Sequence, residues 1–490
     1  MDMRPHIEQH PVFRLVADSA QNLDIEAYVV GGYVRDLLLK RKKQKQDLDF
    51  VCVGSGIELA QKVAQLSQKN PQVHSFQRFG TAMIRLFDLD LEFVGARKES
   101  YNQDSRKPVV EDGTLQDDQN RRDFTINSLA ISLNAKDYGQ LLDPFDGVRD
   151  LQRKLIKTPL SPNQTFSDDP LRMMRAIRFA SELNFDIEAR TFESIQQNKE
   201  RIKIISQERI TDELNKIILS PVPSYGFKLL FHSGLLPIIF PEFCELLGAE
   251  VQDGKSHKDN FYHTLQVLDN LSKYSHDLWL RWAAILHDIA KPQTKRFDKK
   301  VGWTFHGHEE KGAKMVPFIF RKMRLPLNEK MRFVQKLVRL HLRPIALVKE
   351  TITDSAIRRL VVEAGDDVEA LMMLCRADIT SKDHNRVARY LQNFDKVEQK
   401  ILDVGEKDRL RNFKPVIDGE HIMEIFNLKP CPVVGQIKLA VREAILEGLI
   451  SNEWEAALAF TLKVGEKNGL KIVNKISKPI STPQENELED

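Results

Sequence analysis

Cysteine and long apolar runs are both scarce in this sequence of 490 residues. The four cysteines are dispersed and show no paired spacing, which excludes a disulfide-rich scaffold and indicates reduced thiols. No stretch approaches the ~20 apolar residues of a membrane-spanning helix. The start MDMRPHIEQH lacks the pattern of a secretory signal peptide. We therefore expect a cytoplasmic protein without a membrane partner.

An excess of charge of one sign is also lacking. The formal net charge is only +3, which by itself does not indicate a nucleic-acid-binding protein. Local clusters are more informative, because the basic run at 40–45 and the mixed stretch at 386–414 could each meet a polyanionic backbone. A run of charge is nevertheless more often a solvated surface. Neither cluster indicates an oligomeric state.

The most informative motif is the pair of acids Asp47 and Asp49 in the run QDLDFVCVG. Residues two apart on a strand project to the same face, so both carboxylates can hold divalent ions at one site. Gly31 and Gly32 stand between AYVV and VRDLLL, where a strand should run into a turn without Cβ atoms and then a helix. Either motif alone fits a surface turn or a solvated acidic patch. Together they favour a site for a nucleoside triphosphate.

A third acid is a candidate for the same site. The segment TAMIRLFDLDLEFVGAR predicts a β-hairpin, and Glu92 on its second strand could face the first two acids. Asp88, Asp90 and Glu92 alternate with apolar residues, as they would on an ordinary solvated strand. The spacing alone does not favour either interpretation, the third acid of a metal site or a solvated strand face.

The run NRRDFTINSLA adds polar groups suited to a nucleotide. Arg121, Arg122 and Asp123 can contact sugar hydroxyls and phosphates. The apolar residues that follow, Phe124 to Ala130, predict a helix that is buried on one side.

A second helix is predicted to start at Pro170 in FSDDPLRMMRAIRFAS. A carboxylate accepts hydrogen bonds and a guanidinium donates them, so Asp169 with Arg172 can read the edge of a base. Cytosine and adenine present an amino donor beside a ring-nitrogen acceptor, whereas uracil and guanine present a carbonyl beside a ring N–H. Such a pair would accept C and A and reject U and G. A helix cap and a solvated face are the plainer explanations of these residues.

Four runs of the sequence resemble, in their order and spacing, the class II tRNA nucleotidyltransferases, which are the CCA-adding enzymes. These runs are VVGGYVRDLLL, DLDF, RRDFTINSLA and DDPLRMMRAIRF. The bacterial poly(A) polymerase relatives of these enzymes in the polymerase β superfamily share the pattern. The resemblance implies addition of C, C and A to the 3′ end of tRNA from CTP and ATP, without a template. In that family, enzymes that add only CC lack a working loop at the position of the charged stretch 97–118. We predict that this stretch is flexible and supports full CCA addition.

The resemblance also implies the roles of single residues. The catalytic acids are Asp47, Asp49 and Glu92, and the two aspartates bind the metal, for which hard carboxylate oxygens favour Mg²⁺. The nucleotide-binding residues are Gly31, Gly32, Arg35, Arg121, Arg122, Asp123, Asn127, Asp169 and Arg172. Glu208 and Arg209 occupy signature positions of a helix in the neck.

The middle of the chain is dense in histidine. Seven of the 13 histidines lie between His257 and His341, which is too many for scattered core or surface residues. The adjacent pair His287 and Asp288 and the residues around it resemble the HD phosphohydrolase domain. The resemblance implies a metal site formed by His263, His287, Asp288, His308, His341 and Asp378. Mixed imidazole and carboxylate ligands suit Mn, Ni, Co, Fe or Zn. The site could hydrolyse phosphate esters, or its ligands could serve stability or RNA end-trimming with little turnover.

These placements predict an α+β protein. A nucleotidyltransferase α/β head (1–148) is followed by a mainly α-helical neck with RNA-binding helices (149–250), an HD domain (251–385) and a C-terminal helical tRNA-binding part (386–477). Residues 478–490 are predicted to be a disordered tail. Two other functions stay open: a poly(A) polymerase, and an HD phosphohydrolase whose head only binds RNA.

Overall fold

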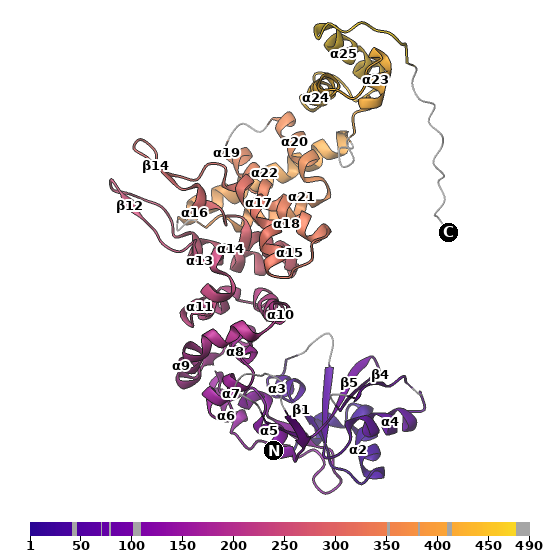
Figure 1. Ribbon diagram of the computed structural model, residues 1–490, viewed down its shortest axis with the longest axis vertical. Coiled ribbons are helices and arrows are strands. Elements are labelled where there is room, and N and C mark those ends of the chain that lie inside the picture. Colours follow the sequence, from indigo (N-terminus) through magenta and orange to yellow (C-terminus); the bar gives the residue numbers. More distant parts are fainter. Residues whose placement is uncertain are drawn as a thin grey trace. The chain divides into compact units, whose positions relative to one another are not determined.

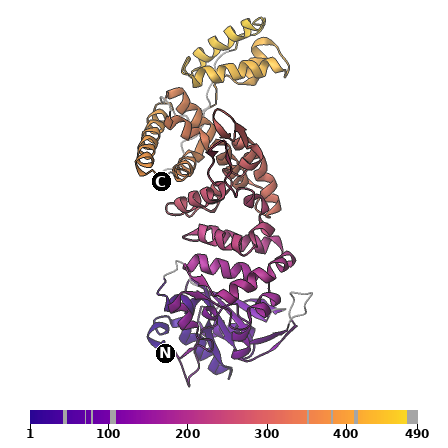
Figure 2. The same cartoon turned by 90° about the vertical axis from the view of Figure 1, so that its left-hand side faces the viewer.

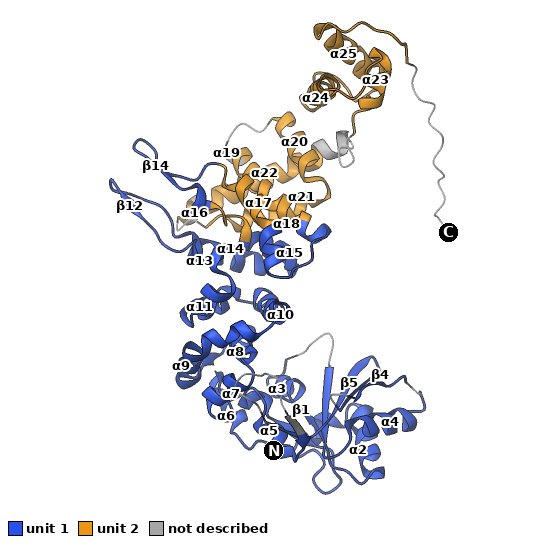
Figure 3. Cartoon of the chain, viewed as in Figure 1, with its two compact units in different colours: residues 1–285, 291–306, 317–331 blue, residues 286–290, 307–316, 332–490 orange. Residues whose placement is uncertain are grey.

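The structure is a computed structural model that describes residues 1–41, 47–69, 71–77, 80–100, 109–349, 353–380, 383–408 and 414–476. The chain forms two compact units, coloured blue and orange in Figure 3. Unit 1 comprises Met1–Ile285, Lys291–His306 and Pro317–Met331; unit 2 comprises Leu286–Ala290, Gly307–Val316 and Arg332–Asp490. This division differs from the predicted boundaries at 148, 250 and 385, so the four-part organisation stays a prediction. The predicted disordered tail and most of the basic run at 40–45 lie outside the described residues.

A seven-stranded sheet forms the N-terminal part of unit 1 (Figure 1). Its strand order is β3-β4-β5-β2-β1-β8-β9, and β2 and β5 are its one parallel pair within the described residues. The strands are β1 (Ala27–Val30), β2 (Asp47–Cys52), β3 (His74–Phe76), β4 (Thr81–Leu86), β5 (Leu89–Gly95), β8 (Ala130–Ser132) and β9 (Leu141–Leu142). The predicted hairpin is confirmed, since β4 and β5 pair antiparallel.

Alternation along the central strands gives the sheet one apolar and one acidic face. In β2, Leu48 and Phe50 are buried, while Asp47 and Asp49 project to the other side. Phe50 stacks on Phe93 of β5 with ring centroids 5.1 Å apart. Helices α2 (Pro11–Asn22) and α4 (Gly56–Leu66) cover this apolar face. The acids therefore lie on the face opposite to these two helices.

One local prediction in the head is wrong. The segment after Asp123, predicted as a helix, forms one 3₁₀ turn at Thr125–Asn127 and then β8, because its backbone pairs with β1. The charged stretch 97–118, predicted to be flexible, contains β6 (Arg97–Ser100), which pairs with β7 (Val109–Asp112), and then α5 (Leu115–Asn120). Its flexibility stays a prediction. A capping box at Thr114 fixes the start of α5. Residues 101–108 lie outside the described part of the chain.

Helices dominate unit 1 beyond β9, and Figure 2 shows them turned by 90°. They are α6 (Gly147–Arg153), α7 (Pro162–Asp168), α8 (Leu171–Leu183), α9 (Ala189–Asn198), α10 (Gln207–Ile218), α11 (Pro223–His232), α12 (Leu236–Ile239), α13 (Pro241–Cys244), α14 (Asn260–Ser272), α15 (Leu278–Leu286) and α16 (Lys291–Thr294), preceded in the head by α1 (Arg4–Ile7) and α3 (Gly32–Leu38). Short strand pairs join them: β10 (Leu155–Ile156) with β11 (Asp186–Ile187), β12 (Val251–Gln252) with β13 (Lys255–Ser256), and β14 (Arg296–Asp298) with β15 (Gly302–Thr304).

Unit 2 is helical in its described residues. Its helices are α17 (His308–Lys322) and α18 (Glu329–Leu340), each contributing in part, then α19 (Leu342–Lys349), α20 (Asp354–Ala364), α21 (Val368–Ala377), α22 (His384–Asp408), α23 (Gly419–Phe426), α24 (Pro432–Leu446) and α25 (Trp454–Lys467). No helix among the described residues is long and apolar enough to cross a bilayer.

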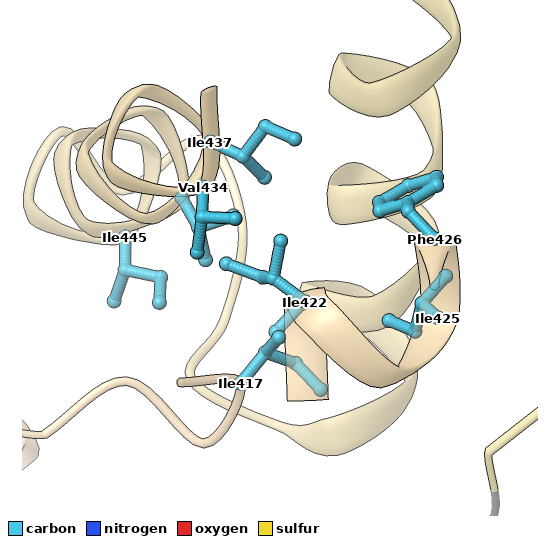
Figure 4. Packing of buried hydrophobic residues seen from close by; sticks show 9 residues of the cluster. Ile417, Ile422, Ile425, Phe426, Val434, Ile437 and Ile445 are labelled. Carbon is cyan, nitrogen blue, oxygen red and sulfur yellow. The ribbon is translucent and has the colours of Figure 1, made fainter. Parts of the chain in front are cut away.

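The last three helices enclose a core of their own (Figure 4). Ile422 and Phe426 of α23 pack with Ile437 of α24. Gly465 lets the Phe426 ring pack closely against α25, because a Cβ at this position would lie 2.1 Å from the ring. The predicted C-terminal helical part therefore contains a packed helical substructure.

Candidate functional site

The parallel register of β2 and β5 brings the predicted catalytic acids together. Asp49 lies opposite Glu92, and Asp47 lies opposite Asp90. All four carboxylates line one cavity of about 1490 Å³. Such a group of oxygen ligands suits a hard divalent cation. Asp90 was not predicted as a site residue, although its position two residues before Glu92 is a usable signal.

The first predicted glycine closes the turn beside these acids. Gly31 has φ of +73°, a conformation that L side chains rarely adopt. A Cβ there would lie 3.1 Å from Arg122 Nη1 and 3.4 Å from Asp49 Oδ2. Gly31 and Gly32 both line the cavity. The glycine thus permits a close approach of a guanidinium and a predicted catalytic acid.

A buried acid holds the two adjacent arginines. Asp118, whose side chain is fully buried, pairs with Arg121 and lies 2.8 Å from Arg122. Burial alone would raise the pKa of Asp118, but the two guanidinium groups lower it. Both arginines line the cavity and are partly exposed. Asp118 was missed in the sequence, although it precedes the arginines by three and four residues, the spacing of an ion pair on one helix face.

Behind these arginines runs a chain of buried polar contacts. Asn127 donates to Asp123 at 2.9 Å and accepts from Arg35 Nη1 at 2.8 Å. Asp123 also accepts from Arg175 Nε at 2.7 Å. Burial alone would raise the pKa of Asp123, but Arg175 and Asn127 lower it to about 2. Arg35 pairs in turn with Asp36.

These contacts change what is expected of three predicted nucleotide-binding residues. Arg35, Asp123 and Asn127 line the cavity, yet each is buried and already bonded to the protein. We expect them mainly to position the partly exposed Arg122 and Arg175.

The predicted base readers stand at the start of α8. Asp169 accepts from the backbone N–H of Leu171 and lies 3.5 Å from Arg209 on α10. Arg172 donates to the carbonyl oxygen of Arg121 at 2.6 Å. Asp169, Arg172 and Arg209 all line the cavity. Asp169 is thus paired with Arg209, and the guanidinium group of Arg172 is held by the backbone of Arg121.

The same wall of the cavity holds a further ion pair. Arg178 Nη1 on α8 lies 3.0 Å from Glu213 on α10, and Lys216 lies 3.0 Å from the same carboxyl group. Arg178 also stacks 4.1 Å over Phe179. Burial lowers the pKa of Arg178. Glu213 and Lys216 were not predicted, because their approach to α8 depends on tertiary packing.

Five of the six predicted HD-site residues lie in unit 2. Ligand atoms of Asp288, His308 and His341 all lie within 4.8 Å of one another, and the two imidazole Nε2 atoms are 3.3 Å apart. His287 Nε2 is 3.2 Å from Asp288 and 3.7 Å from Asp378. The sixth residue, His263, lies on α14 in unit 1, and its membership stays a prediction.

The donor set fits a divalent transition metal. His341 donates its Nδ1–H to the carbonyl oxygen of Val338 at 2.7 Å, which leaves Nε2 free of hydrogen to act as a ligand. Burial and the neighbouring His287 lower the pKa of His341 to about 4, so this ring is neutral. Burial would also lower the pKa of His287, but Asp288 and Asp378 raise it to about 10. A bound metal ion would displace that proton.

Comparison with known proteins agrees with this geometry. The poly A polymerase head domain matches residues 27–157, the "Probable RNA and SrmB- binding site of polymerase A" matches 184–247, and the HD domain matches 260–381. The chain is 30% identical over 459 residues to the CC-adding tRNA nucleotidyltransferase of Thermus thermophilus, covering 89% of this chain and 93% of that protein.

The chain belongs to the tRNA nucleotidyltransferase family. Two A-adding tRNA nucleotidyltransferases are also similar. That of Deinococcus radiodurans is 31% identical over 70% of this chain and 78% of its own length. That of Aquifex aeolicus is 47% identical over 173 residues, which are 35% of this chain and 20% of that protein.

Solved structures support the fold of this tRNA nucleotidyltransferase. The Bacillus stearothermophilus CCA-adding enzyme in complex with CTP has a TM-score of 0.66 at 21% identity, over 94% of this chain and 99% of that one. The α+β fold and the family resemblance are therefore confirmed.

Proposed function

We propose that this tRNA nucleotidyltransferase adds C, C and A in turn to the 3′ end of tRNA, using CTP and ATP and no template. The observation that carries the proposal is the single cavity lined by the acids Asp47, Asp49 and Glu92 and by the candidate base readers Asp169 and Arg172. Both a metal-dependent phosphoryl transfer and a choice between bases are thus available at one place.

In the proposed reaction, the tRNA 3′ oxygen bonds to the α-phosphorus of the nucleotide. The bond from that phosphorus to the bridging oxygen breaks, and pyrophosphate leaves. Asp47, Asp49 and Glu92 would hold Mg²⁺, which would help the 3′ hydroxyl to lose its proton to water and would stabilise the charge on the leaving pyrophosphate. Arg122, held by Asp118 beside Asp49, would neutralise charge on the phosphates.

Base choice is proposed to depend on the start of α8. Asp169 would accept a hydrogen bond from the amino group of C or A, and Arg172 would donate one to the adjacent ring nitrogen. The pairing with Arg209 holds the carboxylate in place. The bond from Arg172 to the Arg121 carbonyl oxygen fixes the guanidinium plane. A fixed donor and a fixed acceptor penalise U and G, whose polar groups are reversed.

Addition of A alone is the second candidate, because two similar relatives are A-adding enzymes. One experiment separates these functions. Transcripts of one tRNA ending before CCA, after CC and after CCA are incubated with CTP, ATP, UTP or GTP alone and with CTP plus ATP, and the products are sequenced. Full CCA addition predicts growth of the first transcript to CCA and then arrest. An A-adding enzyme extends only the CC transcript, and a poly(A) polymerase continues beyond one A.

The HD centre is proposed as a second, metal-dependent phosphohydrolase site. His287, Asp288, His308, His341 and Asp378 would hold a transition metal, together with the predicted ligand His263. Such a metal would supply activated water for attack on a phosphate ester. The 3.3 Å separation of two buried imidazole nitrogens supports a shared ligand.

A further inference from the structure

We propose that two hairpins of unit 1 form a contact surface for the phosphate backbone of tRNA. The hairpins are β12–β13 and β14–β15, and we call residues 250–258 and 295–305 the hairpin arm. In Figure 1 both hairpins project side by side, and β13 packs beside β15. The proposal rests on the family assignment, which makes tRNA the polyanion that the enzyme must hold.

The first hairpin has a stiff turn. Val251 pairs with Ser256 and Gln252 with Lys255. The two residues between the strands, Asp253 and Gly254, have φ of 51° and 71°. Positive φ at both central positions is the turn type that matches the twist of paired strands. The hairpin therefore presents its residues at defined positions.

The second hairpin is fixed at its tip by an acid. Asp298 accepts hydrogen bonds from the backbone N–H groups of Lys300 at 2.7 Å and Val301 at 2.9 Å. These two bonds lower the pKa of the Asp298 carboxyl group. Phe297 and Trp303 pair across the strands with ring centroids 5.2 Å apart.

A lysine joins the two hairpins. Lys255 Nζ donates to the carbonyl oxygens of Lys299 at 2.9 Å and Lys300 at 2.7 Å. Gly302 allows this approach, since a Cβ there would lie 3.0 Å from Lys255. The His257 ring packs edge-on against Trp303 at 5.4 Å. The ammonium group of Lys255 thus holds the backbone at the tip of the second hairpin, which carries the side chains of Lys299 and Lys300.

The charge of the arm fits a polyanion. The arm contains six Lys or Arg residues and three acids. One acid, Glu250, pairs with Lys295 at 2.8 Å, and Asp298 accepts from its own turn. Arg296, Lys299 and Lys300 are exposed. Guanidinium and ammonium groups on a fixed ribbon suit phosphates spaced along a nucleic-acid strand.

The test is the variant Lys299→Glu/Lys300→Glu in the full-length enzyme. Equilibrium binding of a tRNA that lacks CCA is measured across a salt series by filter retention. We expect weaker binding. The slope of log affinity against log salt should also be smaller in magnitude by roughly 1 to 2, because binding releases fewer counterions when phosphate contacts are lost. The KM for tRNA should rise, while kcat and the KM for CTP at saturating tRNA stay unchanged.

Two further variants make the test specific. Lys62→Glu/Lys69→Glu reverses the same charge on α4 and just after it, and should leave the salt slope unchanged. Lys299→Gln/Lys300→Gln should give a smaller loss than the glutamates. Unchanged affinity and slope in the glutamate variant would overturn the proposal. A changed oligomeric state with unchanged tRNA affinity would overturn it too, in favour of a protein interface. Absence of CCA addition by the wild type would instead contradict the proposed function, and the binding data would still decide the role of the arm.

Discussion

Asp49 on β2 lies directly opposite Glu92 on the parallel strand β5. Two acids in this register share one face of the sheet, and the next pair in line is Asp47 with Asp90. Because α2 and α4 cover the other face, these carboxylates meet the cavity and not the core. This relationship between neighbouring strands underlies the account of nucleotidyl transfer.

Asp49→Asn should reduce nucleotide incorporation about 10²-fold or more, because an amide cannot replace an anionic metal ligand. Asp88→Asn is the matched control, since Asp88 is exposed in the turn between β4 and β5. Single-turnover incorporation of CTP into tRNA lacking CCA measures the effect, and thermal unfolding checks the fold. Incorporation at the wild-type rate by Asp49→Asn contradicts the metal assignment.

Asp118→Asn should raise the KM for CTP and destabilise the head by about 2 kcal/mol, since two arginines lose their charged partner. Asp118→Glu should recover part of both losses, because the charge is restored at a shifted position. Urea unfolding and steady-state kinetics provide the two readouts. If the stability falls but the KM for CTP does not change, Asp118 has a structural role alone.

Gly31→Ala should lower stability by about 1 to 2 kcal/mol and also weaken nucleotide binding. The alanine would be strained at φ of +73°, and its Cβ would crowd Arg122. Gly80→Ala is the comparison, because Gly80 also has positive φ but its surroundings are open. Equal nucleotide affinity in the two variants would show that strain alone explains the effect.

Arg172→Ala should reduce the preference for CTP over UTP by roughly tenfold, since one of the two edge-reading groups is lost. Arg209→Ala should have a smaller effect, because Asp169 keeps its bond to the Leu171 N–H. Competition between CTP and UTP at equal concentration measures the ratio. A preserved ratio in Arg172→Ala places base selection elsewhere.

Periodicity and motif order predicted the side-chain face of the acids, the hairpin and the start of α8. They failed at residues 124–130, where the apolar pattern suited a helix but the chain forms a 3₁₀ turn at Thr125–Asn127 and then enters β8, which pairs with β1. Glu213 was missed because its role depends on Arg178, which only folding brings close. Asp118 was missed although its spacing of three and four residues to Arg121 and Arg122 is a local signal. Histidine density predicted a site, and the resemblance to the HD domain supplied its residues, whereas the 3.3 Å contact of His308 with His341 needed the structure.

Replacing His287 and Asp288 together by Ala should remove phosphatase or phosphodiesterase activity supported by Ni, Co or Mn, and leave Mg²⁺-dependent CTP and ATP incorporation largely intact. His276→Ala, at an exposed histidine outside the cluster, is the control. Hydrolysis of bis-p-nitrophenyl phosphate and metal content by mass spectrometry are measured on the same preparations. If the double variant is folded but loses nucleotide addition as completely as Asp49→Asn does, the proposal of two separate sites is contradicted.

The central claim is tested most directly by sequencing the 3′ ends made from one tRNA transcript that lacks CCA, with wild type and Asp49→Asn side by side. With CTP and ATP present, the account predicts that wild-type product ends uniformly in CCA and stops there, while Asp49→Asn leaves the transcript unextended. Wild-type product that ends in CC, gains only untemplated A, or is unextended would contradict it. So would CCA ends made at the normal rate by Asp49→Asn.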